Sequence, residues 1–250
     1  MEFSADFIRI AAYIGAGLSV GMASISAGVG EGYTAGHATY ALMRQPKASD
    51  NLVRNMLVSQ AVTETGAIFA LVVSLLLIFG GFFTAEGGWY KVASLLAAGI
   101  AIGFGSIGPG FGSGYTGGQS LKSIGRMPKH SNAIMNNMLI GQALAQTDAI
   151  FALVISLLLL YSTPNQPSNV TAGTIIATSM AFLGSGIVIG LGTFGPGVAI
   201  GYVAGRTNDM IGRNPRQRGL LTRTMFLGAA VSESTAIYSL VIALLLIFAI

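Results

Sequence analysis

The sequence contains no cysteine and very little charge. Without cysteine, the chain can form neither disulfide bonds nor thiolate metal sites. Aspartate, glutamate, lysine and arginine together make up only 9% of the 250 residues, whereas 52% are hydrophobic. The mean hydropathy of +0.70 agrees with this balance and indicates an integral membrane protein.

Long apolar runs indicate how the chain crosses the membrane. Residues 57–83, 139–161 and 170–202 each reach the roughly 20 residues that a transmembrane helix needs. Open strands would leave backbone groups unpaired in lipid, so helices are predicted. At the N-terminus, Glu2 and Asp6 stand where a signal peptide carries positive charge, and we therefore expect a mature N-terminus.

Three segments of the chain repeat one another without gaps, at offsets of 82 and then 87 residues. The motifs GVGEGYTAG, GFGSGYTGG and GVAIGYVAG begin at Gly28, Gly110 and Gly197. Each motif is followed by Arg-x-Pro, typical of a helix end, and then by a run rich in Leu, Ile and Val. We therefore predict an all-α membrane protein of three tandem two-helix hairpins, over residues 1–85, 86–168 and 169–250. The six predicted spans are 8–42, 52–83, 91–124, 132–162, 170–211 and 219–250.

Basic residues gather around the three Arg-x-Pro turns, which hold 11 of the 13 lysines and arginines. By the positive-inside rule, these turns face the cytoplasm and both termini lie on the other side of what we expect to be a bacterial plasma membrane. The charges are few in each turn and border membrane spans, so they indicate topology and not nucleic-acid binding.

Glycine recurs at equivalent positions in the first helix of each copy. The first two copies carry Gly17, Gly21, Gly28, Gly32, Gly36 and Gly99, Gly103, Gly110, Gly114, Gly118. The third copy carries Gly186, Gly190, Gly197, Gly201 and Gly205. Spacings of four and seven put these glycines on one helical face, where the absence of side chains lets helix backbones approach closely. We expect this face to form a tightly curved inner wall of helices.

The second helices carry acidic residues inside apolar spans. Glu64 and Glu233 occupy the same position in the first and third copies, and Gln146 takes their place in the second. Intramembrane acids are costly and are usually functional, so Glu64 and Glu233 are the candidate ion carriers. Glu31 and Asp148 are the other acids that we place within spans. Hydroxyls follow both glutamates, at Thr65 and Ser234, and add oxygen ligands that suit a hard cation.

These motifs carry a resemblance to a known family. GVGEGYTAGHATYALMRQP followed by SQAVTETGAIFALVVSLLL resembles the hairpin of the c-ring proteolipid, the rotor component of F-type ATP synthases, and the resemblance covers nearly the whole chain three times over. The third copy is similar to the sodium-binding branch of that family. A single hairpin per chain is usual there, so the triple fusion is a departure. Vacuolar-type proteolipids are more often fused, and some of their hairpins lack the acid.

The resemblance implies a set of ion ligands. In the sodium branch, the glutamate binds the ion together with the next hydroxyl and a backbone carbonyl two residues earlier. A polar residue on the glycine-rich helix also contributes, at the place of Glu31. The implied ligands here are Glu31, Val62, Glu64, Thr65, Val231, Glu233 and Ser234. Tyr238 matches a tyrosine that hydrogen-bonds the glutamate, and Thr235 matches a residue that reaches the site through water. Asp148, two residues after Gln146, is either a displaced ligand or a protonated core residue.

The function implied is that of a non-catalytic rotor component. A homo-oligomeric ring in membrane lipid would carry Na⁺, or H⁺, on its glutamates, with no cofactor beyond this coupling ion. The ions would be exchanged at an arginine of the stator a-subunit. The Arg-x-Pro turns would meet the central stalk of a soluble ATPase head, where catalysis takes place.

Two other classes of protein fit parts of the pattern. A single-chain secondary transporter or channel could use a central polar path, but many transporters contain inverted repeats with an odd number of spans. Two spans per repeat keep all three copies in one orientation. A structural proteolipid with vestigial carboxyl groups is the third alternative.

Overall fold

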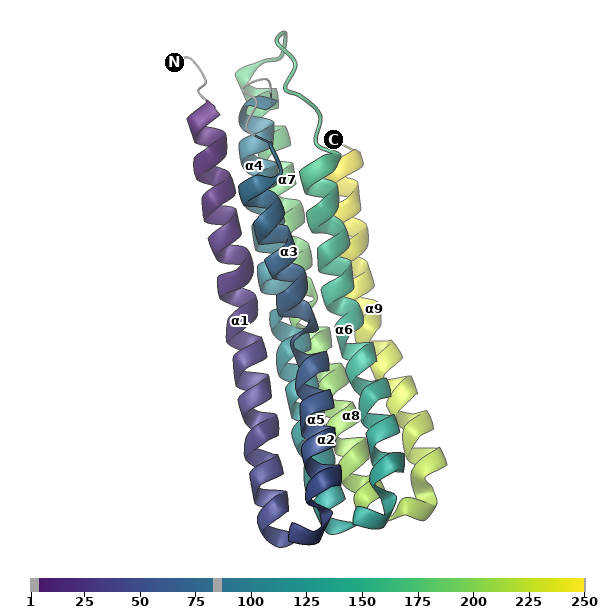
Figure 1. Cartoon of the computed structure of the whole chain (residues 1–250). Coiled ribbons are helices and arrows are strands. Elements are labelled where there is room, and N and C mark those ends of the chain that lie inside the picture. Colours follow the sequence, from purple (N-terminus) through teal and green to yellow (C-terminus); the bar gives the residue numbers. More distant parts are fainter. Residues whose placement is uncertain (1–4, 83–86, 250) are drawn as a thin grey trace.

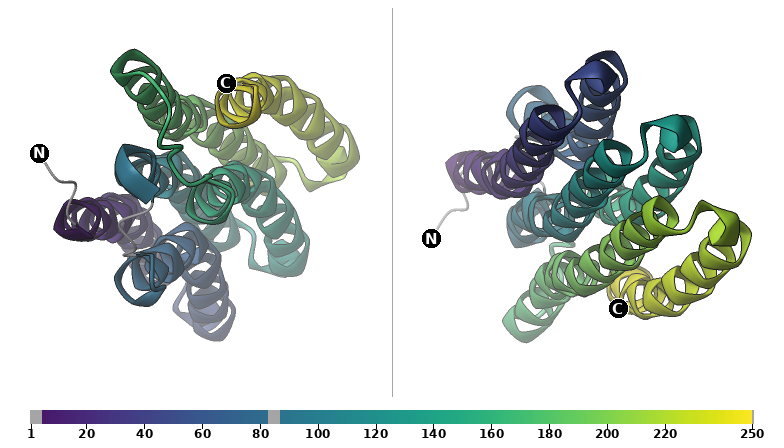
Figure 2. Two further views of the ribbon diagram at one scale, coloured as in Figure 1. Left: turned by 90° about the horizontal axis from the view of Figure 1, so that it is seen from above. Right: turned by 90° about the horizontal axis from the view of Figure 1, so that it is seen from below.

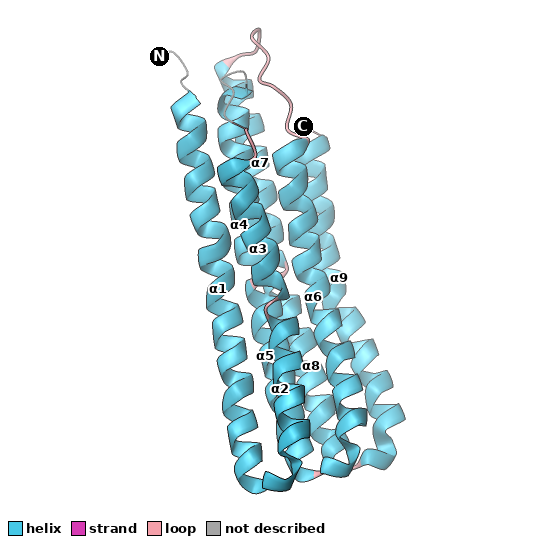
Figure 3. Ribbon diagram, viewed as in Figure 1, coloured by secondary structure: helices cyan, strands magenta, loops and turns pink. Residues whose placement is uncertain are grey.

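The chain folds into long helices that run alternately up and down (Figures 1 and 3). The computed structural model describes residues 5–82 and 87–249. The helices are α1 (Ala5–Arg44), α2 (Ser49–Thr63), α3 (Thr65–Phe79), α4 (Gly88–Gly105), α5 (Ile107–Arg126), α6 (Ser131–Tyr161), α7 (Ala172–Gly192), α8 (Phe194–Arg213) and α9 (Arg218–Phe248). Within the described residues, six helical runs are long and apolar enough to cross a membrane, which confirms the predicted architecture of six spans.

Short 3-10 turns connect the two helices of each hairpin. These turns are η1 (Pro46–Ala48), η3 (Pro128–His130) and η4 (Pro215–Gln217). Each begins at the proline of an Arg-x-Pro motif, because proline has no N–H to continue the preceding helix. All three turns lie at one end of the molecule, and at the other end helix α1 begins and helix α9 ends (Figure 1). The three hairpins therefore share one orientation, as the two-span repeat predicts.

The first span of hairpin 2 and the first span of hairpin 3 are each interrupted by one residue. The interruptions are Ser106, between α4 and α5, and Thr193, between α7 and α8. A proline follows three residues later in both copies, and it removes the N–H that the carbonyl four residues before it would accept. At Pro109 this carbonyl belongs to Gly105, and it accepts a hydrogen bond from the Thr193 hydroxyl at 3.4 Å instead. The first copy has Ala27 at this place, and α1 is continuous.

The second predicted span differs in two ways from the structure. Residue 83, its predicted end, lies outside the described residues, and helix α3 ends at Phe79, where Gly80 and Gly81 follow. The span also has a one-residue interruption at Glu64, between α2 and α3. The backbone nevertheless stays helical there, because the Glu64 N–H donates to the Gln60 carbonyl at 3.0 Å.

The hairpins lie side by side in two rows (Figure 2). The inner row consists of α1, then α4 with α5, then α7 with α8. The outer row consists of α2 with α3, then α6, then α9, so that each hairpin contributes one member to each row. Hairpin 1 and hairpin 3 thus form the two open edges of the row.

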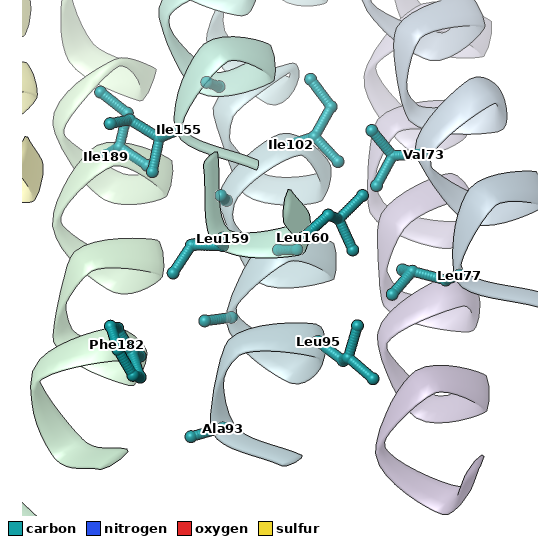
Figure 4. Packing of buried hydrophobic residues seen from close by; sticks show 14 of the residues in the cluster. Val73, Leu77, Ala93, Leu95, Ile102, Ile155, Leu159, Leu160, Phe182 and Ile189 are labelled. Atoms are coloured by element: carbon teal, nitrogen blue, oxygen red, sulfur yellow. The ribbon is translucent and has the colours of Figure 1, made fainter. Parts of the chain in front are cut away.

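A hydrophobic core joins the hairpins toward the end that carries the termini (Figure 4). Side chains from successive hairpins interlock there, among them Val73 and Leu77 of α3, Ile102 of α4, and Ile155 and Leu159 of α6. All five are fully buried. Burying a side chain of this size typically contributes about 1.5–3 kcal/mol, so the core holds the outer row against the inner row.

The repeated glycines let the inner helices touch backbone to backbone. A Cβ added to Gly103 would lie 2.6 Å from the carbonyl oxygen of Leu18, and one added to Gly114 would overlap the Cα of Gly30. In the same way, a Cβ on Gly201 would overlap Gly112 of the preceding hairpin. No larger residue fits these positions, which explains why glycine occupies them in the second and third copies.

The same glycine face is open in the first copy. A Cβ added to Gly17, Gly21, Gly28, Gly32 or Gly36 would meet no described atom within 4 Å. Hairpin 1 therefore presents the face that hairpins 2 and 3 use to pack on their predecessors. We expect this face to pack against hairpin 3 of a second copy of the chain.

Two valine substitutions in equivalent positions separate packing within a chain from packing between chains. We expect Gly114→Val to destabilise the single chain by about 1–3 kcal/mol, because the side chain would overlap Gly30. Gly32→Val should leave the thermal midpoint of the single chain unchanged and prevent the chains from assembling with one another. Circular-dichroism melting and native mass spectrometry in detergent measure the two effects. Normal assembly of the Gly32→Val chain would contradict the interface.

Candidate functional site

The three equivalent positions Glu64, Gln146 and Glu233 lie on the outer helices near the middle of the bundle. In hairpins 2 and 3 the side chain at this position reaches the preceding hairpin. The chain therefore contains two internal junctions, here called junction 1/2 and junction 2/3 after the hairpins that form them.

At junction 1/2, a glutamine amide fills the site. The Gln146 Nε2 donates to the Val62 carbonyl at 3.1 Å and to the Ser113 hydroxyl at 3.0 Å. Val62 is one of the predicted ligand carbonyls, and Ser113 stands at the position of Glu31. The amide hydrogens thus occupy the oxygen donors that a cation would otherwise bind.

A second buried glutamine closes the same junction. The Gln142 Nε2 donates to the Ser59 hydroxyl at 2.8 Å and to the Ser113 carbonyl at 3.0 Å. Both glutamines and Ser113 are buried, and neither glutamine carries a charge. Junction 1/2 is therefore a neutral, hydrogen-bonded contact with no carboxylate.

Junction 2/3 contains a carboxylate in the equivalent place. The Thr147 hydroxyl donates to the Glu233 Oε1 at 2.7 Å and lies 2.6 Å from the Leu144 carbonyl. A carboxylate, a hydroxyl and a carbonyl from two facing hairpins thus converge. The inner helix of hairpin 3 contributes no polar donor, because Ile200 stands at the position of Glu31 and is buried against Ala145 and Ala229.

The remaining halves of this arrangement lie on the two open edges. On hairpin 1, Glu31 is half-buried and Glu64 is exposed. On hairpin 3, the Ser234 hydroxyl donates to the Val231 carbonyl at 2.7 Å, which repeats the pairing of Thr147 with Leu144. Val231 is 73% exposed, so no described part of the chain covers this half-site.

Two of the predicted ligands, Val62 and Glu233, contact side chains of hairpin 2. Within one chain, Glu233 meets Thr147, and the Val62 carbonyl meets Gln146. Tyr238, expected to hydrogen-bond Glu233, is 66% exposed, and the Thr235 hydroxyl donates to the Ser232 carbonyl at 2.9 Å. Glu233 accepts a hydrogen bond from the Thr147 hydroxyl of hairpin 2. Asp148 is fully buried, and neither of its carboxylate oxygens makes a hydrogen bond to any residue that the structure describes.

Sequence reasoning did not identify Thr147 or Leu144. Their hairpin has no glutamate at the carrier position, so the search for ligands next to a glutamate passes over them. The repeat register does contain the signal, because Thr147 is the counterpart of Thr65 and Leu144 the counterpart of Val62.

A further buried acid, Asp209, also escaped the sequence analysis. Its side chain is only 2% exposed, contacts Arg126 of hairpin 2 and lies 3.1 Å from Arg213 Nε. Asp209 therefore neutralises two arginines whose place in the sequence indicates only topological loop charge. Lys122 occupies its position in hairpin 2, so junction 1/2 lacks this ion pair.

Apart from the two glutamine amide nitrogens, the polar atoms described at the two junctions are oxygens. Within residues 5–82 and 87–249, no group of three or more histidine, cysteine or acidic side chains could hold a metal ion. Carboxylate, hydroxyl and carbonyl oxygens suit a hard cation or a proton.

Comparison with known proteins gives one family. A family model for the ATP synthase C-subunit matches the chain three times, over residues 14–77, 96–159 and 183–246. Each match covers both helices of one hairpin.

Individual relatives match either nearly the whole chain or a single hairpin. The A-type ATP synthase K-subunit of Methanocaldococcus jannaschii is 29% identical over 233 residues, which cover 93% of this chain and 94% of the relative. The ATP synthase c-subunit of Dehalococcoides mccartyi is 50% identical over 70 residues, 28% of this chain and 92% of that protein. The ATP synthase c-subunit of Alkaliphilus oremlandii is 48% identical over 75 residues, 30% of this chain and 82% of that protein.

The buried ion pair predicts a difference between two aspartates. Asp209→Asn should destabilise the chain by about 3 kcal/mol or more, because Arg126 would keep a partly buried charge without its partner. Asp50→Asn, at a more exposed position, should change stability by less than about 0.5 kcal/mol. Thermal unfolding in detergent compares the two variants. Equal stability of both would show that the pair does not hold hairpins 2 and 3 together.

Proposed function

The chain belongs to the family of ATP synthase C-subunits, and we propose that it is the ion-carrying rotor component of a sodium-coupled rotary ATP synthase. One observation carries the proposal: at junction 2/3, Glu233 accepts a hydrogen bond from the Thr147 hydroxyl of the facing hairpin, and this hydroxyl also contacts the Leu144 carbonyl. A carboxylate that faces such donors can bind one cation and release it as its surroundings change.

A second carrier site forms when two copies of the chain meet. The edge of hairpin 1 supplies Glu31 and Glu64, and the edge of hairpin 3 of the neighbouring copy supplies Val231 and Ser234. These four residues stand in the same register as the groups at junction 2/3. Closure of the ring through the open glycine face brings the two halves together.

The donor chemistry supports sodium as the coupling ion. A proton needs only one carboxyl group, whereas each site also offers a hydroxyl and a carbonyl oxygen. Several oxygens around one carboxylate replace the water that a hard cation loses on entering the membrane. A neutralised carboxylate then passes the lipid at low cost.

Rotation couples ion flow to chemistry elsewhere. An arginine of the stator a-subunit would displace the ion from Glu64 or Glu233, and a new ion would load through a half-channel. Moving one elementary charge across the membrane yields about 2.3 kcal/mol per 100 mV. The torque would reach the soluble ATPase head through the central stalk, which docks on the Arg-x-Pro turns on the cytoplasmic side of the plasma membrane.

Each chain carries two ions in this scheme. The Gln146 amide occupies junction 1/2, so only Glu233 and the site between chains can load. A ring with fewer carriers moves fewer ions per turn. Fewer ions per ATP favour pumping against a steep gradient over synthesis.

Two types of soluble head have support. The F-type is favoured by the Gly-Val-Gly-Glu-Gly run and the Arg-Gln-Pro turn of hairpin 1. The A-type is favoured by the match along the whole chain to an A-type K-subunit. Mass spectrometry of the catalytic subunits that co-purify with the ring decides between the two.

Replacing the carrier carboxylates tests the function. Glu233→Gln and Glu64→Gln should each abolish sodium-coupled ATPase activity, because a neutral amide cannot exchange an ion. In the native ring, sodium should slow the modification of both glutamates by dicyclohexylcarbodiimide at mildly acidic pH, measured by mass spectrometry of each peptide. If sodium protects neither glutamate over a wide concentration range, protons are the coupling ion.

A pair of threonine variants tests the grouping across hairpins. Thr147→Val should raise the sodium concentration that half-protects Glu233 about tenfold, since the hydroxyl contributes one hydrogen bond or one ligand. Thr65→Val, at the equivalent place in the closed junction 1/2, should leave the protection of both glutamates unchanged. The opposite pattern would mean that each glutamate uses the hydroxyl of its own hairpin.

A further inference from the structure

Junction 2/3 contains an apolar hollow near the end of the molecule at which the first helix of each hairpin begins. It has a volume of about 430 Å³ and is lined by Trp89 of α4 and by five residues of α7, which are Ala172, Ile175, Ile176, Ser179 and Met180. The Ser179 hydroxyl oxygen is buried in the packing, so the surface of the hollow is apolar. Ligand sites in proteins typically measure about 300–1,000 Å³, so the hollow is large enough to hold part of a small molecule.

The hollow results from a difference between equivalent residues. Phe7, Trp89 and Ile176 stand at the same position in the three copies. At junction 1/2, the Phe7 ring packs on the Trp89 ring, with centroids 5.9 Å apart. At junction 2/3, Trp89 has the smaller Ile176 as its counterpart, and both residues line the hollow. The site is therefore a feature of junction 2/3 and not of the repeat.

A second hollow continues the same junction toward the turns. It has a volume of about 220 Å³ and is lined by Ile100 and Phe104 of α4 and by Ile187 and Leu191 of α7. Met180, Ile187 and Leu191 are seven and four residues apart, so they lie on one face of α7. From Ala172 to Leu191 this face extends about 28 Å at 1.5 Å per residue, close to the roughly 30 Å of hydrocarbon in a bilayer.

The surroundings of the two hollows indicate what fills them. Both lie within helical runs that are long and apolar enough to cross a membrane. Trp89 stands in the first turn of α4, and tryptophan is enriched where a membrane meets water. A second copy of the chain would pack on the open edges of the row and not over this internal junction, where Met180 and Leu191 are 58% and 60% exposed. The remaining occupant is lipid.

We propose that junction 2/3 binds one phospholipid per chain, with one of its tails along α4 and α7 from Trp89 to Leu191. The head group of this lipid lies at the level of Trp89. Within a bilayer, packing contacts hold apolar groups together, and an unfilled hollow would forfeit them. The proposal does not depend on the coupling ion, since none of the carrier residues lines either hollow.

Lipid retention in the native assembly tests this site. The assembly is washed in detergent, and the phospholipid that stays bound is counted by mass spectrometry. We expect one phospholipid per native chain and its loss in an Ile176→Phe assembly, because phenylalanine, which hairpin 1 carries at this position, would fill the hollow. Met180→Phe fills the deeper end of the same hollow and should have the same effect. Ile150→Phe is the matched control, because Ile150 lies on α6, is 45% exposed and lines neither hollow.

The fluorescence of Trp89, the only tryptophan of the chain, reports on the same hollow. Phospholipid with brominated tails is added in small amounts to native assemblies stripped of lipid in detergent, so that little lipid surrounds the rest of the protein. Bromine quenches tryptophan on contact. We expect the native assembly to lose most of its fluorescence, with saturation near one lipid per chain, whereas the Ile176→Phe and Met180→Phe assemblies should keep most of theirs.

The two measurements together decide the proposal. Loss of lipid and of quenching in both variants that fill the hollow, with both preserved in the Ile150→Phe assembly, supports the site. A native assembly that keeps no phospholipid after washing would overturn it, as would equal retention in all three variants. A different apolar molecule retained in place of phospholipid would overturn the assignment of the tail.

Discussion

Direct backbone contact between the inner helices is the constraint on which the rest of the structure depends. Glycines such as Gly114 and Gly201 bring neighbouring inner helices so close that no side chain fits between them. This spacing fixes the register of each hairpin against the next. Because the register is fixed, Gln146 meets Val62 and Glu233 meets Thr147. The chemistry at the junctions is therefore a consequence of packing in the other row of helices.

The three copies use one scaffold for different purposes. Junction 1/2 is neutral and closed by glutamine amides, whereas junction 2/3 combines a carboxylate with hydroxyl and carbonyl oxygens. Near the turns, Asp209 adds an ion pair that joins hairpin 3 to hairpin 2. Lys122 stands in its place one hairpin earlier. Fusion of three hairpins into one chain allows such differences, because the order of the hairpins is covalently fixed and each junction can diverge alone.

The sequence was sufficient to predict the helices, the hairpins and their common orientation, because repeats and apolar runs depend only on local pattern. It also identified Glu64 and Glu233 as candidates, since acids in apolar spans are conspicuous. It did not reveal which hydroxyl approaches which glutamate, because that depends on which side of each hairpin its neighbour packs. Thr147 and Leu144 were missed for this reason.

The amide in junction 1/2 has a consequence for the motion of the assembled ring. In the proposed function, carriers lie at junction 2/3 and between chains, and none lies at junction 1/2, so the distances between successive carriers would alternate between one hairpin and two. The ring would then turn in unequal angular steps, one of them twice the other. During the longer step a hairpin without a carrier glutamate would pass the stator, and the elasticity of the central stalk would have to carry the rotation across that gap.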